Sequence, residues 1–464
     1  MFSVSDIAAA TGGAIAGRDD GIVTGVSTDS RTIGAGDLFV PLVGPRFDGH
    51  TYIAEVADKG VTVVLSGRSW AAAHPLPSGV SAVVVPDTLR ALGDLAAAYR
   101  TRYSLPVIGV TGSNGKTTTK EILASIMEQA GPGLKTAGNL NNLIGLPLML
   151  FQLKPGHRWA VLEMGMSEPG EIDRLAEIAR PQVGIVTNAF PAHLESMGSV
   201  ENVARAKGEL FMRLPPGGTA VYNADDPLIA ALPTAYGVVR RSFGLTAGDV
   251  TAAGVICHGL DGTSFTLQVA GGSLPVRLHA CGRHVLANAL AAAAAAEALG
   301  VPAETIRAGL ERFRPGDRRF VVERIGPLML IDDSYNANPA SMAAALTTLA
   351  EVKGEGRLFA VLGDMLELGH ESEALHRRLG AQAGTVARRL YLLGGMAPAV
   401  AAGARLAGLD SSAIVTGADH EEIVSDIIRE ALPGDLVLVK GSRGMGMDRL
   451  ATLLRDRAPI RKEA

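Results

Sequence analysis

The sequence has few cysteines, few aromatic residues and no strongly basic segment, the features that mark disulfide-rich and nucleic-acid-binding proteins. Its 464 residues include only two cysteines, which form no Cys-x-x-Cys pair, and we expect both to be small buried hydrophobes in a reducing compartment. Aromatic residues make up 4% of the chain, the formal net charge is −4, and no lysine- or arginine-rich run occurs. A nucleic-acid partner is therefore not expected, because such proteins usually carry a basic surface and aromatic stacking residues.

Signals for membranes and secretion are also missing. The most membrane-like run, ALAAAAAAEALG at 289–300, is short and interrupted by Glu297. The start, MFSVSDIAAATGG, has neither the basic segment nor the apolar stretch of a signal peptide. We expect a cytoplasmic protein without membrane insertion, and nothing in the sequence suggests more than a monomer.

What is present indicates three α/β domains. At about 150 residues per domain the length favours three, and 47% hydrophobic residues suffice for a core in each. Apolar strand candidates alternate with helical stretches, which predicts parallel sheets covered on both faces. Polar–apolar alternation around 250–282 predicts a small antiparallel appendage. We place the domains at residues 1–104, 105–315 and 316–464.

The segment VIGVTGSNGKTTTKEIL at 107–123 carries the strongest chemical signal. An apolar strand leads into a glycine turn, and a helix is predicted to begin at Lys116. The spacing departs from the phosphate-loop pattern G-x-x-x-x-G-K-[ST], because Val110 stands where the first glycine should be, while Gly112 and Gly115 are present. Backbone N–H groups of such a turn and the helix dipole favour phosphate. We expect Lys116 to reach the terminal phosphates of a nucleotide and the next threonine to bind Mg²⁺.

Three polar residues near the next predicted strands have two interpretations each. Glu163 ends the apolar strand in WAVLEMGM, where a carboxylate can hold Mg²⁺, but a lone glutamate there is more often on the surface. His193 lies in a loop after the strand that we end at Asn188, and a solitary histidine is usually structural. Lys207 follows on a helix, where it could be an exposed residue paired with a neighbouring glutamate.

The third domain has a similar arrangement. The strand in LMLIDDSYNANPASM ends in Asp332 and Asp333, which can bind ribose hydroxyls but are also common turn formers. Lys440 and Arg443 follow the strand in LVLVKGSRGMGMDRL and suit either an anionic ligand or a solvated turn.

Together these segments resemble the ATP-dependent Mur ligases, which build the peptidoglycan stem peptide. That family has its own phosphate loop, T-G-[ST]-x-G-K-T-[ST], matched here by Thr111 to Thr118. Seven separated motifs resemble the member that adds D-alanyl-D-alanine. They are GNLNNLIGLPLML, EMGMSEPGEI, AHLESMGSVENVARAKGELF, GRHVLANALAAAA, DDSYNANPASM, LGDMLELG and KGSRGMGMDRL. The resemblance implies a uridine-nucleotide-binding first domain, a central P-loop ATPase domain and a Rossmann-like third domain that binds D-Ala-D-Ala.

The resemblance also implies roles for individual residues. ATP would contact Thr111, Gly112, Ser113, Asn114, Gly115, Lys116, Thr117, Thr118, Asn288 (adenine), Asp333 (ribose) and Arg319. Two Mg²⁺ ions would lie among Thr117, Glu163 and His193, while Lys116, His193 and a CO₂-derived carbamate on Lys207 would be catalytic. The UDP-muramoyl tripeptide and D-Ala-D-Ala would contact Ser27, Ser30, Arg31, Asn139, Asn141, Asn142, Asn336 and Lys440. Two positions depart from the family pattern: Leu143 replaces a polar residue, and either Arg318 or Arg319 could take the phosphate-side role.

The implied reaction is peptide-bond formation through an acyl phosphate, which releases ADP and phosphate. A sister ligase for diaminopimelate or lysine would be expected to show D-[ND]-P-R in the third domain, and a folylpolyglutamate synthase would lack the uridine-binding domain. A GTPase should carry N-K-x-D, which is absent. Whether the third residue of the stem peptide is diaminopimelate or lysine stays open.

Overall fold

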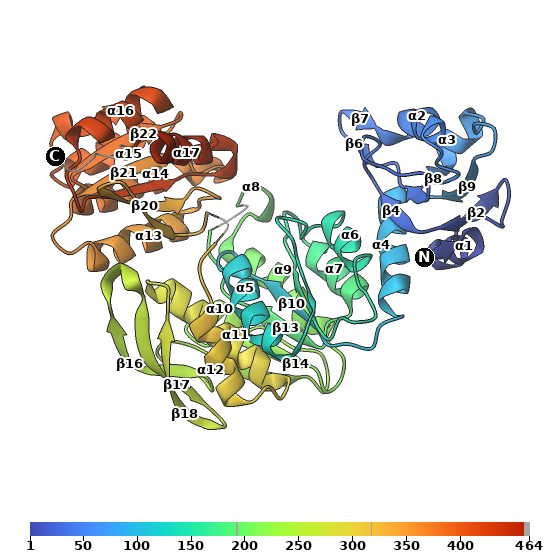
Figure 1. Ribbon diagram of the computed structural model, residues 1–464, viewed down its shortest axis with the longest axis horizontal. Helices are drawn as coiled ribbons and strands as arrows, with labels where there is room; N and C mark the ends of the chain where they lie inside the picture. The colour runs from blue at the N-terminus through green and yellow to red at the C-terminus, as the bar shows by residue number, and fades with distance from the viewer. Residues whose placement is uncertain (192–193, 317, 459–464) are drawn as a thin grey trace.

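The computed structural model describes residues 1–191, 194–316 and 318–458. Figure 1 shows three α/β bodies that follow one another along the chain, with the middle one joining the other two. Each contains a mainly parallel sheet with helices on its faces, as the strand–helix alternation predicts. None of the described helices is long and apolar enough to cross a membrane.

The N-terminal body is built on a five-stranded sheet of order β2-β9-β8-β5-β4. Its strands are parallel except β2, which pairs antiparallel with β9. The strands of this body are β1 (Phe2–Ser3), β2 (Ala14–Ala16), β3 (Ile22–Val23), β4 (Gly25–Ser27), β5 (Asp37–Phe39), β6 (Val43–Gly44), β7 (Phe47–Asp48), β8 (Val63–Gly67) and β9 (Ser81–Val85). The helices are α1 (Val4–Thr11), α2 (Ile53–Asp58), α3 (Arg68–Ala73) and α4 (Thr88–Arg100).

The middle body holds a six-stranded, wholly parallel sheet of order β11-β12-β10-β13-β14-β15. Its strands are β10 (Val107–Thr111), β11 (Leu134–Lys135), β12 (Ala160–Glu163), β13 (Val183–Val186), β14 (Thr219–Asn223) and β15 (Val239–Phe243). The predicted antiparallel appendage is confirmed as β16 (Thr251–Cys257), β17 (Thr263–Val269) and β18 (Gly272–Leu278). The helices are α5 (Lys116–Met127), α6 (Gly145–Leu150), α7 (Glu171–Ala179), α8 (Leu194–Met197), α9 (Val200–Met212), α10 (Pro227–Ala230), α11 (Arg283–Ala298) and α12 (Ala303–Arg312).

The C-terminal body repeats the plan with sheet order β19-β20-β24-β21-β22-β23, in which only β19 runs antiparallel. Its strands are β19 (Val321–Ile325), β20 (Leu328–Asp333), β21 (Leu358–Gly363), β22 (Arg389–Leu393), β23 (Ile414–Thr416) and β24 (Leu436–Lys440). The helices are α13 (Pro339–Val352), α14 (Ser372–Val386), α15 (Ala397–Leu406), α16 (His420–Glu430) and α17 (Met447–Arg457).

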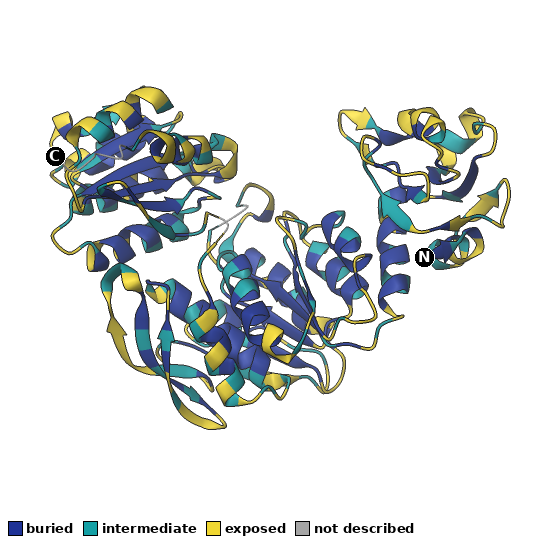
Figure 2. Ribbon diagram, in the orientation of Figure 1, coloured by how far each residue is buried: buried dark blue, intermediate teal, exposed yellow. Residues whose placement is uncertain are grey.

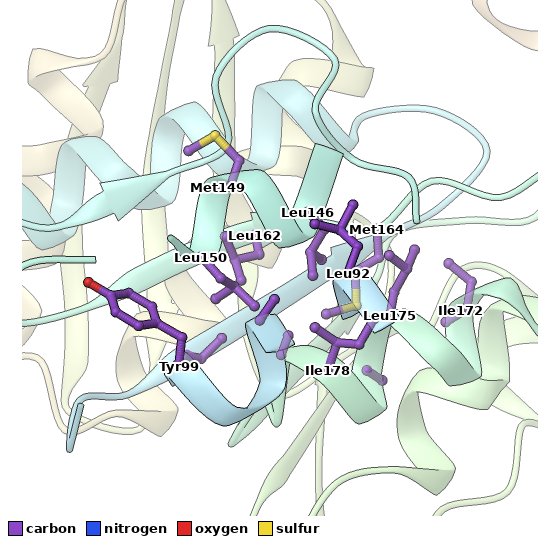
Figure 3. Packing of buried hydrophobic residues seen from close by; sticks show 14 of the residues in the cluster. Leu92, Tyr99, Leu146, Met149, Leu150, Leu162, Met164, Ile172, Leu175 and Ile178 are labelled. Carbon is purple, nitrogen blue, oxygen red and sulfur yellow. The ribbon is translucent and has the colours of Figure 1, made fainter. Parts of the chain in front are cut away.

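The hydrophobic core does not stop at the first predicted boundary. Side chains from α4 of the N-terminal body, such as Leu92 and Tyr99, form one buried cluster with Leu146, Leu175 and others of the middle body, as Figure 3 shows. Central strands of the larger sheets, such as β10, β21 and β24, are buried along their whole length (Figure 2). Burying such apolar surface stabilises by about 25 cal/mol per Å², so the first two bodies are held together as one packed unit. The exact domain limits stay a prediction.

Two smaller predictions need correction. Cys281 is buried as expected, but Cys257 is exposed, because it stands at the end of β16, an edge strand of the three-stranded sheet whose last five residues face solvent. The strand expected to end at Asn188 ends at Val186.

Candidate functional site

One cavity of about 810 Å³ lies between the middle and C-terminal bodies. Its size is in the usual range for small-molecule sites. Sixteen of the predicted site residues line it: Gly112, Ser113, Asn114, Gly115, Lys116, Thr117, Thr118, Asn141, Asn142, Glu163, Lys207, Asn288, Arg319, Asp333, Asn336 and Lys440. Ligands of open parallel sheets bind at the carboxyl ends of the strands, and β10, β12, β20 and β24 all end at this cavity.

The turn between β10 and α5 can be made only with glycine at two positions. Gly112 has φ 151° and Gly115 has φ 83°, conformations that side chains rarely adopt. A Cβ at Gly112 would also overlap the Thr187 hydroxyl, and one at Gly115 would overlap the Asn288 side chain. The predicted variant phosphate loop is therefore a tight turn that opens directly into the N-terminus of α5.

Hydrogen bonds fix this loop from the residues that directly follow strand β13. The Asn114 N–H donates to Asn188 Oδ1 at 2.9 Å, and the Thr187 hydroxyl donates to the Asn114 carbonyl at 2.6 Å. Lys116 folds back over the loop, and its ammonium donates to the Gly112 carbonyl at 2.6 Å. Burial lowers the pKa of Lys116 to about 8; nearby Glu163 opposes this shift and Arg319 adds to it.

Glu163 stands beside the loop because β12 pairs with β10 in a register that places it opposite Val110. Glu163 is 1% exposed, which excludes the surface interpretation. Glu163 Oε1 accepts no hydrogen bond from any described residue and lies 3.4 Å from the ammonium of Lys120, while Asn141 donates to Oε2 at 3.4 Å. A buried carboxylate oxygen without a hydrogen-bond donor is suited to bind a cation or a water molecule.

The sequence did not single out Lys120, although it lies one helical turn after Lys116. It is 1% exposed and donates to the Thr136 carbonyl at 2.7 Å. Its ammonium also pairs with Glu121 at 2.7 Å. The spacing of the two lysines, i and i+4 on one helix, was the available signal.

Lys207 lies on α9 with 3% of its surface exposed, so the interpretation as a solvated helix lysine is wrong. Its ammonium makes no hydrogen bond or ion pair with any described residue. The neighbouring Glu209 instead accepts from the backbone N–H groups of Gly170 and Asp173. Burial, and secondarily the charge of Lys116, hold the pKa of Lys207 well below its usual range. His193, the third predicted metal ligand, lies outside the described residues.

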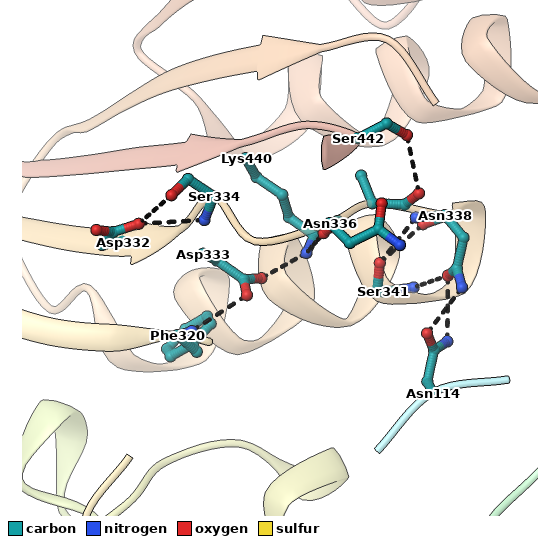
Figure 4. A network of polar contacts seen from close by, with 11 residues as sticks. Asn114, Phe320, Asp332, Asp333, Ser334, Asn336, Asn338, Ser341, Lys440 and Ser442 are labelled. Carbon is teal, nitrogen blue, oxygen red and sulfur yellow. Dashed lines mark hydrogen bonds and ion pairs between the residues drawn. The ribbon is translucent and has the colours of Figure 1, made fainter. Parts of the chain in front are cut away.

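The C-terminal body contributes an ion pair to the opposite wall of the cavity. Asp333 and Lys440 are register partners at the ends of β20 and β24, and their charged groups lie 2.6 Å apart. Lys440 also donates to the Asn336 carbonyl at 3.0 Å, and Asp333 accepts from the Phe320 N–H (Figure 4). Lys440 is 2% exposed, which excludes a solvated turn.

A contact that the sequence did not indicate joins the two walls. Asn114 in the phosphate loop and Asn338 at the start of α13 exchange two amide hydrogen bonds, at 2.7 and 3.1 Å (Figure 4). Asn338 is also the N-cap of α13 and accepts from the Ser341 N–H. The sequence signal for Asn338 was only its position before Pro339, which is typical of a helix start.

Comparison with known proteins identifies the family of the chain. Residues 110–296 match the Mur ligase middle domain, residues 317–443 the Mur ligase glutamate ligase domain, and residues 22–100 the Mur ligase family catalytic domain. A UDP-N-acetylmuramoyl-tripeptide–D-alanyl-D-alanine ligase of Escherichia coli is 39% identical over 93% of both chains. The chain belongs to the Mur ligase family. The predicted family and three-domain α/β architecture are thus confirmed.

Solved structures of Mur ligases have the same arrangement. A crystal structure of MurF from Acinetobacter baumannii matches with a TM-score of 0.89 at 34% identity, over 98% of this chain and 99% of the other. The MurF ligase from Thermotoga maritima in complex with ADP matches with a TM-score of 0.83 at 29% identity, over 93% and 97%.

Some residues expected at a Mur ligase site do not line the cavity. Thr111 is buried at the end of β10, behind the loop, and Asn139 is exposed. The three others lie in the N-terminal body: Ser27 is the last residue of β4, and Ser30 and Arg31 follow it. Arg31 is paired with Asp29 at 2.7 Å and lowers the pKa of that carboxyl to about 2.

The two departures from the family pattern have structural counterparts. Leu143 packs against the buried cluster shared by the first two bodies, so its apolar side chain extends the core. Of the two arginines, Arg319 lines the cavity, whereas Arg318 is exposed and pairs with Asp448 on α17.

Proposed function

We propose that this Mur ligase joins D-alanyl-D-alanine to UDP-N-acetylmuramoyl-tripeptide at the expense of ATP, giving the pentapeptide precursor of peptidoglycan. The observation that carries the proposal is the shared cavity, in which a phosphate loop faces the Asp333–Lys440 pair. The names of relatives that are similar along the whole chain support the choice of substrates.

ATP occupies the cavity with its phosphates on the loop from Gly112 to Thr118. The backbone N–H groups at the start of α5 and the ammonium of Lys116 face these phosphates. Lys116 exchanges its contacts with loop carbonyls for phosphate oxygens, which are stronger acceptors. Adenine lies near Asn288, which packs against Gly115, and the ribose lies near Asp333.

Mg²⁺ fits the donor set next to the loop. Thr117 and Glu163 are buried oxygen donors, and Glu163 Oε1 accepts no hydrogen bond from the described residues. Hard oxygen ligands of this kind are the ones Mg²⁺ prefers. Thr117 and Glu163 would hold the ion, which when bound neutralises charge on the phosphates.

Lys207 acts as a carbamate. Its depressed pKa leaves a fraction of neutral amine, which can add to CO₂ with formation of an N–C bond and loss of a proton. The product replaces a buried amine that has no partner among the described residues by an anion close to Lys116. This exchange removes the repulsion between two lysines and adds two hard oxygen donors.

The reaction consists of two successive displacements, with an acyl phosphate of the tripeptide between them. A terminal carboxylate oxygen of the tripeptide forms a bond to the γ-phosphorus, the bond to the β–γ bridging oxygen breaks, and ADP leaves. The amine of D-Ala-D-Ala then attacks the acyl carbon, loses a proton and expels phosphate. Lys116 stabilises the charge on the transferring group, and the two walls exclude water from the acyl phosphate.

The peptide substrates occupy the remaining surfaces. Ser27, Ser30 and Arg31 contact the uridine diphosphate, and Asn141 and Asn142 hold the muramoyl peptide. Asn139 belongs to the same loop. Asn336 and Lys440 orient D-Ala-D-Ala, and the ammonium of Lys440 suits its carboxylate.

The test is a ligation assay with each substrate omitted in turn. The chain, Mg²⁺ and ATP are mixed with UDP-muramoyl-tripeptide and D-Ala-D-Ala, and product mass and released phosphate are measured. We expect one pentapeptide per phosphate and no product when free diaminopimelate or L-lysine replaces the dipeptide. A comparable kcat/KM for a free diamino acid would instead assign the chain to the sister activity. Comparing kcat/KM for tripeptides that end in diaminopimelate and in lysine identifies the preferred third residue of the stem peptide.

A further inference from the structure

Arg319 is held in the cavity by an unusual backbone. The residues on both sides of it, Arg318 and Phe320, have positive φ angles of 56° and 53°. Such conformations cost about 1–2 kcal/mol for residues other than glycine and persist only where surrounding contacts impose them. Two hydrogen bonds do so: the Tyr335 N–H donates to the Arg318 carbonyl at 3.2 Å, and the Phe320 N–H donates to Asp333 Oδ1 at 3.1 Å.

These bonds bring the Tyr335 ring under the side chain of Arg319. The guanidinium carbon lies 4.1 Å from the ring centroid, well inside the distance for a cation–π contact. Arg443 approaches the same ring at 5.6 Å, and its backbone N–H donates to Asn336. The Tyr335 ring therefore contacts two arginines: Arg319, from the segment that joins the middle and C-terminal bodies, and Arg443, which follows β24.

The Arg319 guanidinium has no anionic partner among the described residues. Its Nε is buried and donates no hydrogen bond to any described residue, and it forms no ion pair within that part of the chain. Its positive charge also contributes to the lowered pKa of Lys116, so both cations lie near one another in the same cavity. Arg318 differs, because its side chain is exposed and neutralised by Asp448.

We propose that Tyr335 is a positioning residue that uses its ring face to hold Arg319 toward the phosphate loop, where the guanidinium binds the phosphate chain of the nucleotide. The inference rests on the proposed use of ATP and adds the residue that orients this arginine. The tyrosine hydroxyl takes no part, since it makes no hydrogen bond with any described residue.

The experiment measures ADP affinity by calorimetry in the full chain with Mg²⁺ present. Tyr335→Leu removes the ring and should weaken ADP binding roughly tenfold, the scale of a partly desolvated cation–π contact. Tyr335→Phe keeps the ring and should restore affinity to within about twofold. Arg318→Met, which alters the neighbouring arginine outside the cavity, is the matched control and should leave affinity unchanged.

A double-mutant cycle decides whether the ring acts through the arginine. In an Arg319→Met background, the further change Tyr335→Leu should cost less than twofold. An additive loss would overturn the proposal and indicate that the ring contacts the nucleotide itself. Equal losses for Tyr335→Phe and Tyr335→Leu, or no loss for Tyr335→Leu, would overturn it as well. The binding of ADP needs neither peptide substrate. The calorimetric result therefore tests the role of Tyr335 even if the chain does not catalyse the proposed ligation.

Discussion

Replacing Gly115 by alanine should damage nucleotide binding far more than folding. The new Cβ would strain a backbone with φ 83° and would meet Asn288 Oδ1 well inside the 3.0 Å that real Cβ atoms respect. The strain alone costs about 1–2 kcal/mol. Because the nearest atoms belong to one side chain, the overlap is relieved by displacing Asn288, the residue assigned to adenine.

Gly217 is a suitable control. It has φ 80°, and a Cβ there would meet nothing within 4 Å. Gly115→Ala and Gly217→Ala should therefore lower the thermal unfolding midpoint by similar amounts, while only Gly115→Ala weakens ADP binding, by about 10-fold or more if one buried hydrogen bond to the base is lost. Thermal scans and calorimetry with ADP measure the two effects. If both variants bind ADP with equal affinity, the position of Asn288 beside Gly115 does not contribute to nucleotide binding.

Three further predictions concern ionisable residues. Lys116→Ala should leave the fold intact and reduce phosphate release at least 10²-fold, because one preorganised donor supplies about 3–4 kcal/mol; near-normal release by a folded variant would exclude the assignment. Lys207→Ala should lose activity and regain part of it with added formate or acetate, whereas unchanged activity without an added anion would show that no carbamate is needed. Burial lowers the pKa of His284 to about 4; the unfolded chain, with the ordinary value near 6.5, binds more protons between these values, so stability should fall as the pH drops from 6.5 to 4. His284→Gln should flatten that part of the melting-temperature profile, and an unchanged slope would contradict a lowered pKa of His284 in the folded chain.

Much of the site could be predicted because its residues follow parallel strands. Gly115, Lys116, Glu163 and Asp333 each come within a few positions of an apolar strand, and the carboxyl ends of neighbouring parallel strands meet at one edge. The family resemblance then assigned roles that these residues alone left open. Burial resolved the ambiguity of Lys207, which lies four residues after Val203 and three before Leu210 on the apolar face of α9. Helical spacing shows that face but not whether a lysine on it reaches past the core to solvent.

Contacts between distant segments were beyond the reach of sequence patterns. The amide pair of Asn114 and Asn338 joins residues 224 positions apart. No motif or periodic pattern in the sequence links these two asparagines. The stacking of Arg319 on Tyr335 depends on a backbone with positive φ at non-glycine residues, which no propensity favours. The core shared through α4 likewise arises from tertiary packing across the domain boundary that the sequence predicts at residue 104.

The central claim is that ATP activates the terminal carboxylate of the tripeptide inside the cavity shared by the phosphate loop and the Asp333–Lys440 pair. The most direct test uses UDP-muramoyl-tripeptide labelled with ¹⁸O in that carboxylate, with ATP, Mg²⁺ and D-Ala-D-Ala. Mass spectrometry of the released phosphate should find one ¹⁸O atom per molecule, since the carboxylate oxygen bonded to phosphorus leaves with it. Unlabelled phosphate, with product still formed, would contradict an acyl phosphate.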